Sequence, residues 1–135
     1  MNIIICGSIS AAEEILSVQK QLQNKGHTVE IPEGVKRKEL RTLDAPAVEK
    51  ADVKIKHDLI RGYYEKIKLT DIVLVVNPEK NGVKGYIGGN TLIEMAFAHV
   101  LGKKLYVLHE IPDLPYASEI LATQPLLLGS KLDVL

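Results

Sequence analysis

The run Ile72-Val73-Leu74-Val75-Val76 constrains the fold more than any other segment of this sequence. Five consecutive apolar residues cannot alternate between a buried face and a solvated face, so a strand here must be covered on both faces. Such a strand is typical of the centre of a parallel sheet with helices on either side. The segment therefore predicts an α/β fold.

The first thirty residues predict a strand, a helix and a second strand. Residues 2–6 are a short apolar run, rich in β-branched residues, that reads as a strand buried on both faces. Ser10-Ala11-Ala12-Glu13 is a capping box that would begin a helix. Residues 28–31 then form the second strand. A crossover between two parallel strands should be right-handed.

The same alternation continues along the rest of the chain. The charged segment 33–50 is expected to be an exposed connection. The further predicted elements are a helix near 51–69, a strand at 72–76, a helix near 91–101, a strand at 104–108, a short helix near 116–123 and a strand at 125–128. This order predicts one doubly wound domain spanning 1–135, flavodoxin-like or Rossmann-like, with five parallel strands in the order 2-1-3-4-5.

Composition excludes several classes of function. Seventeen basic and seventeen acidic residues cancel, so no net positive surface favours nucleic acid or an anionic membrane. No apolar run approaches the roughly 20 residues that span a bilayer, and the N-terminal run is too short for a signal peptide. The four histidines show no metal-ligand spacing, and no G-x-G-x-x-G motif indicates a dinucleotide. We expect a cytoplasmic protein without metal or cofactor.

The predicted strand order places a ligand crevice after the first and third strands. The loops there are Cys6-Gly7-Ser8-Ile9-Ser10 and 77–91, which are rich in glycine, serine and asparagine. Free N–H groups at Gly7-Ser8 could face an anion, or the loop could be a tight turn with Ser10 as N-cap. Tyr86, within the second loop, is the best candidate to stack on a base.

Glu94 has two interpretations. Thr91-Leu92-Ile93-Glu94 is itself a capping box, so Glu94 could do no more than accept a hydrogen bond from the Thr91 amide. Its neighbours are otherwise apolar, so burial would raise its pKa while the helix N-terminus would lower it. Such opposed effects suit a nucleophile or an acid–base group.

Three segments support a family resemblance when they are taken together. They are Cys6-Gly7-Ser8-Ile9, a helix leading through Thr70-Asp71 into a hydrophobic strand, and a glycine-rich loop leading to Glu94-Met95-Ala96-Phe97-Ala98. The set, which covers residues 2 to about 108, resembles the nucleoside 2-deoxyribosyltransferase superfamily, including the 2′-deoxynucleoside 5′-phosphate N-hydrolases. In that family a glutamate attacks C1′ of the deoxyribose and displaces the base, and water or a second base resolves the glycosyl-enzyme.

The resemblance implies roles for particular residues. Glu94 occupies the position of the nucleophile, and Asp58 is the candidate for the family's helix aspartate. Ser8 matches a family serine that resembles a phosphate or sugar contact. Together with the two loops at the switch point, the candidate substrate-binding residues are Cys6, Gly7, Ser8, Ile9, Tyr86, Gly88, Gly89, Asn90 and Thr91. The implied ligand is a nucleoside or nucleotide, and the implied assembly is a homodimer or a larger homo-oligomer.

The sequence also departs from the family pattern. Ile4 stands where the family often has a tyrosine that contacts the glutamate, and Gly88 stands where it has an aspartate or serine. Asp58 lies further from Asp71 than the equivalent pair in the family. Either Asn90, Thr91 and Tyr86 replace the missing partners, or the substrate and chemistry differ.

Two functions therefore compete. The first is an N-glycosyl-bond enzyme, a hydrolase or transferase, in which Glu94 is the nucleophile. The alternative is a non-catalytic module of the same fold that binds a nucleotide-like ligand, with Glu94 only capping its helix.

Overall fold

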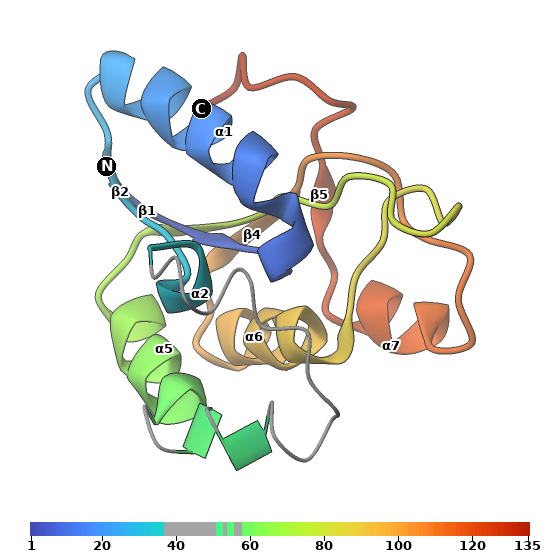
Figure 1. The fold of residues 1–135 in the computed structure, drawn as a ribbon. Coiled ribbons are helices and arrows are strands. Elements are labelled where there is room, and N and C mark those ends of the chain that lie inside the picture. Colours follow the sequence, from blue (N-terminus) through green and yellow to red (C-terminus); the bar gives the residue numbers. More distant parts are fainter. Residues whose placement is uncertain (37–50, 53, 56–57) are drawn as a thin grey trace.

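A computed structural model describes residues 1–36, 51–52, 54–55 and 58–135. It contains one sheet, ordered β2-β1-β3-β4-β5, in which every pair of neighbouring strands is parallel (Figure 1). The strands are β1 (Asn2–Cys6), β2 (Thr28–Glu30), β3 (Ile72–Val75), β4 (Lys104–Val107) and β5 (Leu126–Leu127). The predicted fold class and strand order are confirmed.

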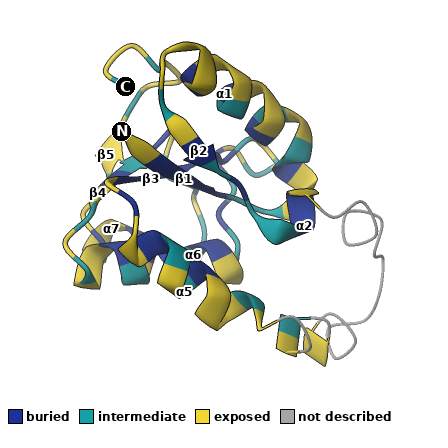
Figure 2. Ribbon diagram, turned by 90° about the vertical axis from the view of Figure 1, so that its left-hand side faces the viewer, coloured by how far each residue is buried: buried dark blue, intermediate teal, exposed yellow. Residues whose placement is uncertain are grey.

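Helices cover both faces of the sheet (Figure 2). The helical elements are the 3₁₀ turn η1 (Ile9–Ala11) and the α-helices α1 (Ala12–Asn24), α2 (Glu33–Lys36), α5 (Leu59–Lys68), α6 (Gly89–Val100) and α7 (Ala117–Ala122). Helix α1 lies on one face, and α5, α6 and α7 lie on the other. None of the helices in the described ranges is long and apolar enough to cross a membrane.

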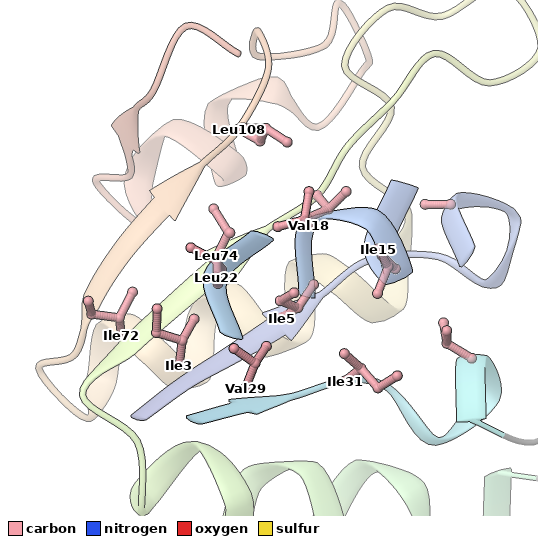
Figure 3. Close-up of a cluster of buried hydrophobic side chains, with 13 residues drawn as sticks. Ile3, Ile5, Ile15, Val18, Leu22, Val29, Ile31, Ile72, Leu74 and Leu108 are labelled. Carbon is pink, nitrogen blue, oxygen red and sulfur yellow. The ribbon is translucent and has the colours of Figure 1, made fainter. Parts of the chain in front are cut away.

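The side chains of β1 alternate between two hydrophobic cores. Ile3 and Ile5 pack in the core beneath α1 (Figure 3). Ile4 and Cys6 pack in the opposite core, with residues of α5, α6 and α7. All four side chains are almost completely buried, and each aliphatic one contributes about 1.5–3 kcal/mol relative to an exposed position. A strand buried on both faces is what the uninterrupted apolar run requires.

Three local predictions are wrong. Ser10 does not cap α1, because η1 comes first and Ala11 is the N-cap, while the Ser10 hydroxyl lies 2.6 Å from the Ser8 hydroxyl. The helix expected from about 51 to 69 does not run through Asp58, whose φ of 48° is incompatible with a right-handed helix. The start of the expected exposed connection is instead α2, in which Gly34 and Val35 are buried. Residues 37–50 of that connection lie outside the described residues.

The Asn77 side chain links the long β3–α6 connection to the segment after β4 by hydrogen bonds. Its Nδ2 donates to the Gly85 carbonyl at 3.1 Å and to the Glu110 carbonyl at 2.9 Å, and its Oδ1 accepts from the His109 N–H at 2.9 Å. The Asn77 side chain is buried, so these three bonds satisfy its polar atoms in place of water. The connection that carries Tyr86 is thereby held against the sheet.

We expect Asn77→Ala to lower the free energy of unfolding by about 2–4 kcal/mol, because it leaves two carbonyls and one N–H without their partner. Urea unfolding followed by circular dichroism measures this change. Asn24→Ala, at the exposed end of α1, is the matched control and should change stability by about 0.5 kcal/mol or less. If both substitutions changed the free energy of unfolding equally, the hydrogen bonds of Asn77 would not stabilise the β3–α6 connection.

Candidate active site

A cavity of about 440 Å³ lies where β1 and β3 end, at the point where the strand order reverses. More than half of its described lining residues are candidate site residues from the sequence: Gly7, Ser8, Ile9, Tyr86, Gly88, Gly89, Asn90, Thr91 and Glu94. The remaining lining residues are Ser10, Pro32, Glu33, Gly34, Lys54, Leu59, Tyr63 and Lys80. The structure therefore brings the two predicted loops and Glu94 to one cavity.

Two of the predicted site residues do not line this cavity. Cys6 is fully buried at the end of β1 and reaches the site only through its contact with Glu94. Asp58 is exposed at the start of α5, and its Oδ2 accepts a hydrogen bond from Arg61 at 3.2 Å. Its left-handed backbone marks a turn before the helix rather than a helical position facing the cavity. Nothing in the position of Asp58 supports a catalytic role.

The start of α6 differs from the predicted one. The helix begins at Gly89 with Gly88 as N-cap, so Thr91 is the third helical residue and cannot be the N-cap of a capping box with Glu94. The first intrahelical bond joins the Leu92 N–H to the Gly88 carbonyl. The preceding N–H groups, those of Gly89, Asn90 and Thr91, have no intrahelical acceptor, and these three residues line the cavity. They form an anion-attracting end of a helix.

Glu94 lies one turn further along α6, at the floor of the cavity. It is 7% exposed, and burial raises its pKa to about 8. A hydrogen bond from the Cys6 thiol and the charge of Lys54 act in the opposite direction and lower it. The Glu94 carboxyl is therefore mostly protonated at pH 7, and it becomes a carboxylate within the pH range in which enzymes commonly work.

Two further titratable groups lie close to Glu94, namely the Cys6 thiol and the Tyr63 hydroxyl. Burial, followed by the proximity of Glu94, raises the pKa of the Cys6 thiol well above its usual value, so Cys6 stays a neutral donor. The Tyr63 hydroxyl donates to the Ile5 carbonyl, and burial with the nearby Cys6 and Glu94 raises its pKa as well. Neither group competes with Glu94 as the ionised nucleophile.

Sequence reasoning missed Tyr63 and Lys54 as cavity residues. Tyr63 belongs to the apolar stripe of α5 and was indistinguishable in the sequence from a core tyrosine. Lys54 precedes α5 and joins the site only through tertiary packing. No spacing or motif marks either residue.

The cavity lining favours an anionic ligand. Lys54 and Lys80 belong to it, and the Lys80 ammonium lies 5.0 Å from the centre of the Tyr86 ring. Among the described lining residues, the one acidic residue besides Glu94 is Glu33, which pairs with Lys66 at 2.8 Å and with Lys36 at 3.6 Å. Its negative charge is therefore compensated. Beyond the α6 amides, the Ser8 and Ser10 hydroxyls supply further hydrogen-bonding groups.

The arrangement combines three features that suit nucleophilic transfer of a glycosyl or acyl group. A carboxyl group with a raised pKa lines a cavity, a neutral thiol lies beside it, and two lysines and the N-terminal residues of α6 line the same cavity. Within the described ranges, no cluster of three or more His, Cys, Asp or Glu side chains is placed to hold a metal ion.

No protein-family model matches this chain, and comparison with curated proteins finds no match. Among solved structures, the chain is similar to the CMP N-glycosidase BcmB of Clostridium botulinum, with a TM-score of 0.52. The sequences are 18% identical, and the match covers 94% of this chain and 85% of BcmB. The chain therefore shares its fold with this N-glycosidase over almost its whole length.

Proposed function

We propose that this protein cleaves the N-glycosidic bond of a nucleoside 5′-monophosphate, with Glu94 as the nucleophile. The observation that carries the proposal is the placement of the Glu94 carboxyl, buried yet facing the cavity at the switch point of the sheet. The fold shared with an enzyme that acts on the glycosidic bond of CMP supports it. The resemblance of Cys6-Gly7-Ser8-Ile9 and the Glu94 segment to the deoxyribosyltransferase superfamily supports it independently.

The proposed reaction has two steps. The Glu94 carboxylate attacks C1′ of the sugar, the glycosidic bond breaks, and its electron pair leaves with the base, which takes a proton from solvent. Water then attacks C1′, the ester bond to Glu94 breaks, and the proton of the water returns to solvent, which releases the sugar phosphate and restores the carboxylate. A second base in place of water would make the protein a transferase. Positive charge that develops on the sugar stabilises the carboxylate, which offsets the cost of ionising Glu94 in its buried position.

The cavity suggests where each part of the nucleotide binds. In this proposal the phosphate lies against the uncapped N-terminus of α6 and the hydroxyls of Ser8 and Ser10. The base stacks on Tyr86, whose ring borders the cavity beside Gly88. The Cys6 thiol keeps the carboxyl of Glu94 oriented toward C1′, in place of the tyrosine that Ile4 replaces.

One observation favours a second function, a nucleotide-binding module without catalysis. A carboxyl with a pKa of about 8 is mostly neutral at pH 7, and a neutral Glu94 could donate a hydrogen bond to a bound base instead of attacking the sugar. The earlier form of this alternative, in which Glu94 caps α6, does not fit the helix start at Gly89. The homo-oligomeric assembly and the cytoplasmic location stay predictions.

Incubation with CMP, dCMP, the corresponding purine nucleotides and the parent nucleosides tests the proposal, with released base measured by chromatography. We expect base release from at least one 5′-monophosphate, at a kcat/KM about 10-fold or more above that of its nucleoside, because each charge-assisted phosphate contact contributes about 1.5–3 kcal/mol. Calorimetric titration on the same samples separates the alternatives. Binding without base release would support the binding module and contradict the enzyme.

A further inference from the structure

A second cleft is lined by another part of the β3–α6 connection than the one that lines the Glu94 cavity. It has a volume of about 740 Å³ and, as far as the structure describes the chain, shares no lining residue with the first cavity. Its lining comes from α1, the β3–α6 connection, the segment after β4, and β5 with the segment after it: Glu14, Asn77, Pro78, Glu79, Lys84, Gly85, His109, Glu110, Leu127, Gly129 and Ser130. The proposed nucleotide chemistry uses none of these residues.

Three of these side chains form a hydrogen-bonded chain across the cleft. The His109 Nδ1 lies 2.7 Å from the Ser130 Oγ, and the His109 Nε2 contacts the Glu14 Oε1. Because the Glu14 carboxylate accepts a hydrogen bond at Nε2, it favours the tautomer of His109 in which Nε2 carries the proton. The Nδ1 lone pair is then directed at the serine hydroxyl. This is the relation of nucleophile, base and orienting carboxylate that activates serine in hydrolases.

The backbone holds Ser130 in an uncommon conformation. Gly129 and Ser130 both have positive φ values, 62° and 66°, and the Ser130 N–H donates to the Leu108 carbonyl at 2.7 Å. A left-handed conformation in a residue other than glycine costs about 1–2 kcal/mol and is enriched at functional sites. The turn places the hydroxyl against His109 rather than away from the sheet.

We propose that Ser130, His109 and Glu14 form a second active site, in which Ser130 accepts the acyl group of a small carboxylic ester. The Ser130 Oγ attacks the carbonyl carbon while its proton moves to the His109 Nδ1. The ester C–O bond then breaks, and the departing alcohol takes that proton. Water attacks the acyl-serine by the same route, releasing the carboxylic acid and restoring the hydroxyl.

Other groups of the cleft suit this chemistry. The Lys84 ammonium lines the cleft and supplies positive charge for the oxyanion of the tetrahedral intermediate. Leu127 and Pro78 offer apolar surface to a short acyl chain. Glu14 is partly buried against His109, so its carboxylate can stabilise the imidazolium that forms during the attack.

A serine-directed fluorophosphonate probe followed by peptide mapping tests this site, together with hydrolysis of p-nitrophenyl acetate by the same protein. We expect the probe on Ser130 of the wild type and no labelling there in Ser130→Ala. His109→Gln and Glu14→Gln should each slow both labelling and ester hydrolysis by about 100-fold or more. Ser118→Ala removes an exposed serine of α7 and is the matched control, with labelling unchanged.

Two results would overturn the proposal. One is the absence of probe on Ser130 in wild-type protein, and the other is labelling that proceeds equally fast without His109. Because the two cavities are separate, Glu94→Gln should leave Ser130 labelling unchanged. The outcome is therefore independent of whether the protein cleaves nucleotides.

Discussion

Replacing Glu94 with glutamine is expected to raise the melting temperature at pH 9 by about 10 °C, and to change it little at pH 5. The pKa of Glu94 is about 8 in the folded protein, against an ordinary value of 4.5. A raised pKa means that the folded state binds the proton more tightly than the unfolded state. The contribution of protonated Glu94 to the free energy of unfolding is therefore fully present below pH 4.5, and it is lost progressively as the pH rises to about 8.

The size of this loss follows from the shift. Each unit of pKa corresponds to about 1.4 kcal/mol, so the ionisation of Glu94 lowers the free energy of unfolding by about 3–5 kcal/mol at pH 9. Glutamine has nearly the shape of the protonated glutamic acid and never ionises. It therefore avoids the loss at high pH while matching the wild type at low pH.

Thermal unfolding of the wild type and Glu94→Gln between pH 5 and pH 9 measures this effect. The difference between the two curves should grow with pH, since all other titrating groups are common to both proteins. Glu119→Gln, which changes an exposed carboxylate of α7, is the control and should follow the wild type. Parallel curves for the wild type and Glu94→Gln would show that Glu94 is not a buried group with a raised pKa.

The same substitution is expected to lower kcat/KM for base release by about 10³-fold or more, because an amide cannot attack C1′. Nucleotide affinity should change by about threefold or less, since glutamine keeps the size and the hydrogen-bonding capacity of the neutral acid. Glu94→Asp retains the carboxylate but withdraws it by one methylene, which should cost about 100-fold in kcat. Steady-state base release and calorimetric binding measure the two quantities.

Glu119→Gln again serves as the control and should keep full activity. A Glu94→Gln protein that binds and cleaves as the wild type does would remove Glu94 from the mechanism. If instead Glu94→Gln loses activity and gains stability at high pH, Glu94 lowers the free energy of unfolding at high pH but is needed for base release.

The fold could be predicted from the sequence because burial on both faces leaves a direct pattern. The apolar runs at residues 2–6 and 72–76 have no polar face, and such strands pair at the centre of a parallel sheet. Once these two strands are neighbours, the loops that follow them must converge. The location of the cavity was predictable for the same reason.

Local helix signals were less reliable. Both predicted capping boxes, at Ser10 and at Thr91, fit the sequence motif but not the structure. A capping motif describes only side chains that could cap, whereas the backbone before each helix is fixed by tertiary contacts. Gly88-Gly89 allows α6 to begin two residues before Thr91, and this earlier start places Glu94 at the cavity rather than at its own helix cap.

The sequence indicated one partner of Glu94, Cys6, only as part of the family resemblance, and it indicated neither Tyr63 nor Lys54. Cys6 was expected to pack in the core, and it does, but it also contacts the Glu94 carboxyl from the end of β1. Lys54, just before α5, and Tyr63, within α5, both line the cavity. No sequence motif in this part of the chain indicates that it lies near Glu94. Asp58 lies outside the cavity lining, at a left-handed turn before α5 rather than within the helix that was expected to carry it, and its catalytic role stays a prediction.

The pH dependence of base release tests the central claim most directly, since it joins the chemistry to the ionisation of Glu94. The account predicts that kcat/KM for a nucleoside 5′-monophosphate rises with pH, with an apparent pKa near 8 for the free protein, and that Glu94→Gln shows no release above background at any pH. Base release that falls through this range, or that persists in the Glu94→Gln protein, would contradict a carboxylate nucleophile at Glu94.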